Sequence, residues 1–102
     1  MKGTVTILKA DGSVSIRYVT APLALEELQA AVGGYIETVP YFDKYGPHDC
    51  VAFCNEEGKL NNLPLNEQAT QAWQEAVGQP LGDVLVGDII ILSGDKEFLK
   101  SL

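Results

Sequence analysis

The chain of 102 residues is long enough for one hydrophobic core but too short for a second independent unit, so we expect a single domain over residues 1–102. Apolar residues make up 46% of the chain and charged residues 21%, which is ordinary globular usage and argues against disorder. The formal charge of -7 repels phosphate backbones and anionic headgroups, so we expect no direct DNA or RNA binding and no membrane binding. We interpret the scattered acidic residues as a solubility feature, with mimicry of DNA phosphate as the minor alternative.

Residues 1–6 lack the apolar stretch of a signal peptide, and no apolar run reaches the length that spans a bilayer. We therefore expect a cytoplasmic protein. Cys50 and Cys54 would lie on one face of a strand with their Cα atoms about 13 Å apart, which is too far for a disulfide between them. We expect both thiols to be reduced.

A hairpin over residues 4–19 is the first element that the sequence predicts. Its centre, Asp11-Gly12, is the dipeptide that best supplies the positive φ angles of a two-residue turn. Such a turn places Ile7 opposite Ile16, so that the apolar residues of the two strands share one face of the hairpin.

An amphipathic helix is predicted from about Leu23 to Val32, because its apolar residues recur at helical spacing. Gly33 or Gly34 can end this helix in a left-handed conformation, and a strand then begins at Tyr35. Phosphate-binding loops run from a strand into a helix, and the order here is the reverse. A helix cap with close backbone approach therefore explains the two glycines better than a nucleotide cradle does.

The middle of the chain predicts a surface loop over residues 41–49 and a second hairpin over residues 50–63, whose return strand is residues 59–63. A second helix follows, with Asn66 as its N-cap and Trp73 as the anchor of its buried stripe.

The apolar run over residues 84–92 indicates a strand that is buried on both faces and central in the sheet, bent at Gly87-Asp88. Residues 95–102 can add one helical turn. The resulting order, ββαβββαβ, predicts an α+β fold with a mainly antiparallel sheet and two helices packed on one face.

Five ordered motifs cover most of the chain. They are Leu28-Gln29, Val32-Gly33-Gly34-Tyr35-Ile36-Glu37-Thr38-Val39, Asn55-Glu56-Glu57-Gly58-Lys59-Leu60, Leu63-Pro64-Leu65-Asn66-Glu67-Gln68-Ala69-Thr70 and Val86-Gly87-Asp88. Together they resemble a small family catalogued as domain of unknown function 3846. Members of that family occur in bacteriophages and bacterial mobile elements, sometimes beside antirestriction-type genes. The resemblance implies a context, with the host cytoplasm as the location of a phage-encoded member, and it implies no mechanism.

The sequence shows no catalytic or metal motif. His48 is the only histidine, and the chain contains no nucleophile-elbow motif with which it could act as a base. We therefore interpret it as a solvated loop residue and expect no enzyme. The spacing of His48, Cys50 and Cys54 matches no zinc signature, and we expect no metal and no cofactor. Glu37 lacks the paired carboxylate of a glycosidase. It could accept a hydrogen bond from a ligand's exocyclic amine, or form a salt bridge with Arg17.

Some side chains are suited to a small polar ligand because they offer stacking faces, amide groups, one cation and one carboxylate. These candidate ligand-binding residues are Arg17, Tyr35, Glu37, Tyr41, Tyr45, His48, Asn55 and Asn66. The asparagines also have an ordinary explanation, since turns and caps favour them.

We therefore expect a non-enzymatic protein that binds a small ligand or another protein. In the context that the resemblance implies, we hypothesise that it counters host antiviral defence by sequestering a nucleotide signal. A single Arg17 compensates poorly for several phosphates, so a site shared between the subunits of a homo-oligomer is expected. One alternative is a protein-interaction module that inhibits a host defence or restriction protein. A less favoured alternative is a hydrolase that acts through Glu37 or His48.

Overall fold

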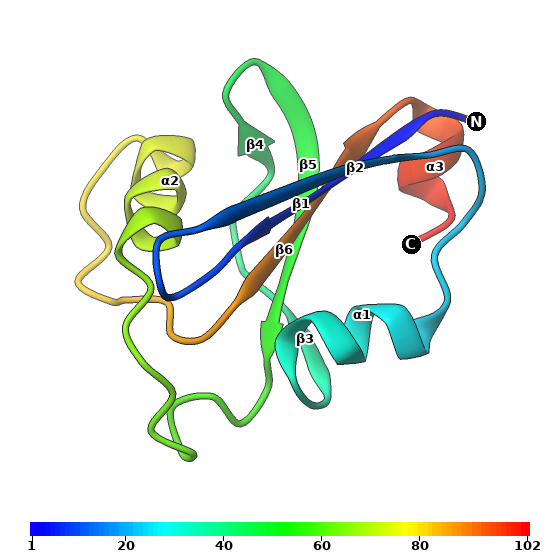
Figure 1. Cartoon of the computed structure of the whole chain (residues 1–102). Coiled ribbons are helices and arrows are strands. Elements are labelled where there is room, and N and C mark those ends of the chain that lie inside the picture. The colour runs from blue at the N-terminus through cyan, green and yellow to red at the C-terminus, as the bar shows by residue number, and fades with distance from the viewer.

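A computed structural model describes all 102 residues (Figure 1). Six strands and three helices follow one another along the chain: β1 (Gly3–Leu8), β2 (Val14–Val19), α1 (Leu25–Val32), β3 (Ile36–Thr38), β4 (Lys44–Tyr45), β5 (His48–Asn55), α2 (Glu67–Val77), β6 (Ile89–Gly94) and α3 (Lys96–Lys100). The strands form a sheet in the order β2-β1-β6-β5-β3, with the short β4 paired to β5, and every pairing is antiparallel. The predicted α+β fold class is confirmed.

The predicted central strand is β6, which lies between β1 and β5. Its residues Ile89, Ile90, Ile91 and Leu92 are at most 2% exposed. The strand spans Ile89–Gly94, so the predicted start at residue 84 and the predicted bend at Gly87-Asp88 are wrong. Because alternate residues of a strand point to opposite sides, β6 needs a hydrophobic cover on both faces of the sheet.

The two longer helices supply these covers from opposite faces, so their placement on one face is a wrong prediction. Ala69 and Trp73 of α2 belong to the cluster that contains Leu8, Ile89 and Ile91. The second cluster lies on the other face. It contains Leu28 and Val32 of α1, Phe98 of α3, and Val5, Phe53, Ile90 and Leu92 from the sheet. A strand that is apolar on both faces makes a one-sided arrangement unfavourable, because one face would remain exposed to water.

The first hairpin forms, but its predicted turn and register are wrong by one residue. Lys9 N donates to Ser13 O at 2.9 Å, so the loop has three residues, and Thr6 lies opposite Ile16. Ala10 N, which a two-residue turn would use, donates instead to the Asp88 carboxylate at 2.9 Å. Three-residue hairpin loops are a common alternative to the two-residue turn, with the last loop residue left-handed, and Gly12 has φ +93°.

The double glycine behaves as predicted. Gly33 ends α1 in the left-handed conformation, with φ +79°, and its N–H donates to Gln29 O at 2.8 Å. A Cβ atom on Gly34 would lie 2.8 Å from Nδ2 of Asn55, so a side chain there would displace the Asn55 amide from its hydrogen bonds with Val32 O and Glu57 N.

The expected return strand over residues 59–63 does not form. The chain makes successive turns there, and β3 takes the place beside β5. Part of the predicted loop over residues 41–49 is ordered instead as a small hairpin, in which Tyr45 pairs with His48. The predicted last helical turn is α3, whose N-cap is Asp95. Lys2 N donates to the Asp95 carboxylate at 2.9 Å, and Figure 1 shows the N-terminus beside α3.

Candidate functional site

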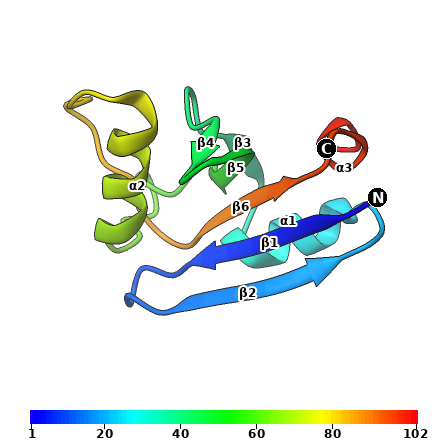
Figure 2. The same cartoon turned by 90° about the horizontal axis from the view of Figure 1, so that it is seen from above.

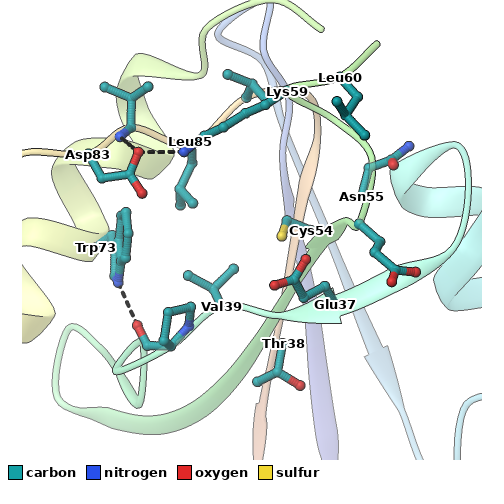
Figure 3. Close-up of a pocket in the computed structure, with 14 residues that line it drawn as sticks. Glu37, Thr38, Val39, Cys54, Asn55, Lys59, Leu60, Trp73, Asp83 and Leu85 are labelled. Carbon is teal, nitrogen blue, oxygen red and sulfur yellow. Dashed lines mark hydrogen bonds and ion pairs between the residues drawn. The ribbon is translucent and has the colours of Figure 1, made fainter. Parts of the chain in front are cut away.

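A pocket of about 280 Å³ lies at the β3 edge of the sheet, and we call it the β3 pocket. It is bounded by β3 with Val39 and Pro40, the end of β5, the turn at residues 56–60, Trp73 of α2 and the segment 83–86. In Figure 3, Glu37 and Cys54 lie on one side of the pocket and Trp73 lies on another. Half of the lining residues are hydrophobic, which is typical of small-molecule sites.

The apolar wall of the pocket is held in place by hydrogen bonds. Nε1 of Trp73 donates to Pro40 O at 2.8 Å, which fixes the indole ring against the chain that leaves β3. Leu85 N donates to the Thr70 hydroxyl oxygen at 2.9 Å, which ties the segment 83–86 to α2. Since both contacts form within the free protein, the pocket exists before any ligand binds.

The β3–β5 register places Glu37 directly opposite Cys54. Burial and, next, the Glu37 carboxylate raise the pKa of the Cys54 thiol above its usual value. The thiol is therefore protonated at neutral pH, and a protonated thiol is a poor nucleophile. The pocket consequently lacks the thiolate that covalent catalysis through Cys54 would need.

Lys59 and Asp83 form an ion pair at the rim of the pocket, and Asp83 also accepts a hydrogen bond of 2.8 Å from Val84 N. The Lys59 contact and the Val84 N–H lower the pKa of Asp83. Glu37 has no hydrogen-bond or ion-pair partner, so its carboxylate is available to a ligand.

The eight predicted ligand-binding residues do not converge on one site. Glu37 and Asn55 line the β3 pocket. Asn55 also has a structural role, because its Nδ2 donates to Val32 O at 3.2 Å and its Oδ1 accepts from Glu57 N at 2.8 Å. Tyr35 and Tyr41 are exposed and line neither this pocket nor the groove described next.

An open groove of about 930 Å³ lies elsewhere, between β2 and the β4–β5 hairpin, and we call it the β2–β4 groove. It contains two more of the predicted residues, Tyr45 and His48, and its opposite wall is formed by Ile16 and Tyr18. Burial raises the pKa of the nearby Cys50 thiol to about 11, with nearby carboxylates adding to the effect, so no thiolate is available beside His48 either.

Asn66 is fully buried, and both polar atoms of its side chain are engaged. Nδ2 donates to the carbonyl oxygens of Leu8 and Gly87 at 2.8 Å each, and Oδ1 accepts from Ala69 N at 3.0 Å. The predicted N-cap is thus confirmed, and this residue has no free group to offer a ligand.

The alternative salt bridge between Arg17 and Glu37 is wrong. Arg17 lies on β2 and Glu37 on β3, which are the two outer strands of the sheet. Arg17 instead forms an ion pair with Glu27 of α1 at 3.2 Å. The order of strands, which the sequence did not reveal, sets this separation.

No cluster of three His, Cys, Asp or Glu side chains is close enough to hold a metal ion. None of the helices combines the length and the apolar character that crossing a membrane requires.

The family model described as a domain of unknown function, DUF3846, matches residues 1–102. The chain belongs to this family. The resemblance found in the motifs is therefore confirmed over the whole DUF3846 domain. Comparisons with curated proteins and with solved structures gave no match.

Sequence reasoning missed three residues that shape the pocket of this DUF3846 domain: Lys59, Trp73 and Asp83. Trp73 was predicted only as the anchor of the buried stripe of its helix. A buried tryptophan usually has a hydrogen-bond partner for its N–H, and this requirement could have suggested that Trp73 forms an ordered wall of the pocket. Lys59 and Asp83 are 24 positions apart, and no local pattern connects them.

Proposed function

We propose that the protein is a non-catalytic binding protein and that its ligand occupies the β3 pocket. The observation that carries this proposal is the unpaired carboxylate of Glu37, which faces a pocket with an ordered apolar wall. Glu37 is exposed, and its carboxylate without a partner favours a ligand group that donates hydrogen bonds or carries positive charge. The ligand therefore combines an amino group, which binds Glu37, with a flat or apolar body that contacts Trp73 and Leu85.

The remaining charges of the pocket support the absence of catalysis. Acid–base hydrolysis by two carboxylates needs one that is protonated and one that is ionised. Glu56 and Asp83 are the other carboxylates that line the pocket, and the lowered pKa of Asp83 keeps it ionised at neutral pH. The protonated Cys54 thiol supplies no nucleophile. Binding is thus the activity that these groups support best.

A more specific form of the proposal is that the ligand is a nucleotide signal of host antiviral defence, which the protein sequesters. A nucleobase is flat and often carries an exocyclic amine, which matches Trp73 and Glu37. Lys59 is the only cation that lines the pocket, and Glu56 lies on the same rim. The phosphates of such a ligand would therefore point out to solvent and not into the pocket.

The second candidate is a module that inhibits a host defence or restriction protein. The observation that favours it is Leu60, which lines the pocket and is 82% exposed. A large apolar side chain at the rim of a pocket is typical of a protein interface. In this case the β3 pocket would receive a basic side chain of the partner.

The test combines native mass spectrometry with fluorescence of Trp73, which is the only tryptophan of the chain. The protein is exposed to extracts of bacteria with activated nucleotide-signalling defences, and its native and denatured masses are compared. We expect a small adduct that is lost on denaturation and that changes the emission of Trp73. Any nucleotide identified in this way is then titrated directly.

Two matched variants locate the site. Glu37→Gln keeps the size of the side chain and removes its charge. We expect the ligand to bind at least about fivefold more weakly, since hydrogen bonds to charged groups are stronger by ~1 kcal/mol or more. Glu57→Gln makes the same change outside the pocket and is expected to bind normally. An adduct that is indifferent to Glu37→Gln would refute the site. Absence of any adduct would refute the small ligand and favour a protein partner, to be sought by pull-down with wild type and Leu60→Lys.

A further inference from the structure

The strand β2 is one edge of the sheet and is exposed along its length. It pairs only with β1, and Figure 2 shows no other element lying outside it. Three of its apolar side chains, Val14, Ile16 and Tyr18, are 49%, 58% and 81% exposed. Proteins usually protect such an edge with a proline, a bulge or a covering segment, and β2 has none of these.

The backbone of β2 offers its free hydrogen-bonding groups at the same three residues. Lys9 N donates to Ser13 O, so Lys9 and Ser13 are a hydrogen-bonded pair of the β1–β2 hairpin. Hydrogen-bonded residues alternate along an antiparallel pair, so the odd-numbered residues of β2 direct their backbone groups toward β1. The N–H and C=O groups of Val14, Ile16 and Tyr18 consequently point to the free edge.

We propose that β2 pairs antiparallel with β2 of a second copy of this chain, around a twofold axis at Ile16. In this register Ile16 lies opposite Ile16, and Val14 lies opposite Tyr18 on both sides of the axis. Each of these pairs exchanges two backbone hydrogen bonds, which satisfies every outward-pointing group of the three residues. Their side chains also share one face of the sheet, where pairs of aromatic and β-branched residues are favourable.

The charges of the protein favour this edge as the contact between two copies. The chain carries a net charge of -7, so two copies repel each other over most of their surfaces. β2 has no acidic residue, and its one charged residue, Arg17, is already paired with Glu27 of its own chain at 3.2 Å. This edge is therefore a surface on which two acidic molecules can approach with little repulsion.

The charges also disfavour one alternative register. With the axis at Ile16, Arg17 lies opposite Ser15 of the second copy. A shift of the partner by two residues would instead place the two Arg17 side chains opposite each other, and like charges in that position are destabilising. A strand from a different protein could also form hydrogen bonds with the free edge. Only a second copy of β2, however, presents Tyr18, Ile16 and Val14 in the order that pairs them with Val14, Ile16 and Tyr18 of the first copy.

The dimer is tested by size-exclusion chromatography with light scattering over a range of protein concentrations. We expect wild type to form a dimer, and Ile16→Lys to be a monomer with an unchanged circular dichroism spectrum, because residue 16 is solvent-exposed in the single chain. Leu60→Lys makes the same change at an exposed apolar residue in the β3 pocket and is expected to remain a dimer.

The register of the dimer is tested by cysteine cross-linking and by a substitution that introduces one negative charge. Ile16→Cys, in a Cys54→Ser background, is expected to cross-link between chains with a short bismaleimide, whereas Leu60→Cys is not. Ser15→Asp places a carboxylate opposite Arg17 and is expected to lower the dimer dissociation constant about threefold or more. A wild-type protein that stays monomeric at hundreds of micromolar, or a dimer that persists in Ile16→Lys, would overturn the proposal. No small ligand is present in these assays, so their result is independent of the function proposed above.

Discussion

The side-chain amide of Asn66 donates a hydrogen bond of 2.8 Å to the carbonyl oxygen of Leu8, and so connects the start of α2 to the end of β1. The same nitrogen donates to Gly87 O at 2.8 Å, just before β6. One buried amide therefore satisfies two backbone groups of the sheet, while its oxygen caps the helix through Ala69 N. The position of α2 beside the β3 pocket depends on this residue.

Replacing Asn66 with alanine is expected to destabilise the protein by about 3 kcal/mol or more. The loss of the cap costs about 1 kcal/mol, and each buried carbonyl left without a donor costs about 1–3 kcal/mol. Asn66→Asp separates these effects, because it retains the capping oxygen but cannot donate to Leu8 and Gly87. Urea denaturation followed by circular dichroism measures the change. Asn61→Ala, at an exposed asparagine, is expected to stay within about 0.5 kcal/mol of wild type, and an equal effect at both positions would contradict this role.

Trp73→Phe tests the hydrogen bond that orders the pocket wall. Phenylalanine keeps an aromatic ring but cannot donate to Pro40 O, so we expect a loss of about 1 kcal/mol in unfolding free energy, with a further cost if the smaller ring leaves a void. Circular dichroism is the readout, since the variant has no tryptophan. Unchanged stability would show that the indole N–H bond does not order this wall.

The reactivity of Cys54 tests the position of Glu37. Because the Glu37 carboxylate raises the pKa of this thiol, Glu37→Gln is expected to lower that pKa. At a fixed pH near 8, more thiolate is then present and alkylation by iodoacetamide is faster, as mass spectrometry of the intact protein can follow. Cys50 is buried and its pKa is about 11, so it is expected to remain slow in both proteins.

The matched change for this experiment is Glu57→Gln, whose carboxylate does not influence the thiol. Its alkylation rate is expected to equal that of wild type. A Glu37→Gln protein that reacts no faster than Glu57→Gln would mean that Glu37 and Cys54 are not neighbours.

Gly94 is expected to tolerate no side chain. A Cβ atom there would collide with Lys2 O and lie 2.8 Å from Cα of Gly3, and both of these neighbours are backbone atoms. We expect Gly94→Ala to destabilise the protein by several kcal/mol, since the contact cannot be relieved by a rotamer change. Gly46→Ala is the control: its φ of +59° is also positive, but it has open space, so about 1–2 kcal/mol is expected. Equal thermal stability of the two variants would contradict the close approach.

Much of the fold was predictable from local signals. The cap at Gly33, the N-cap at Asn66 and the apolar strand β6 each depend on residues close together in the sequence, and each was confirmed. The predicted hairpin over residues 50–63 failed because turn residues there do not bring the chain back beside β5. The β3 strand pairs in that place instead.

The candidate site was less predictable. Glu37 and Asn55 were identified by their chemistry, but Lys59, Trp73 and Asp83 reach the same pocket from three separate segments. Which carboxylate remains unpaired depends on partners that are distant in sequence. Asp83 is paired through Lys59, and Glu37 is not, although their sequence contexts do not distinguish them.

The sequence by itself determined the helix caps at Gly33 and Asn66 and which strand is central, because helix caps and hydrophobic periodicity act over a few residues. The tertiary structure decided that α1 and α2 cover opposite faces, that Arg17 pairs with Glu27, and that Glu37 faces Cys54. These relationships depend on strand order and register, which follow from burying two apolar faces at once. No short segment contains that information, since the faces are assembled from residues throughout the chain.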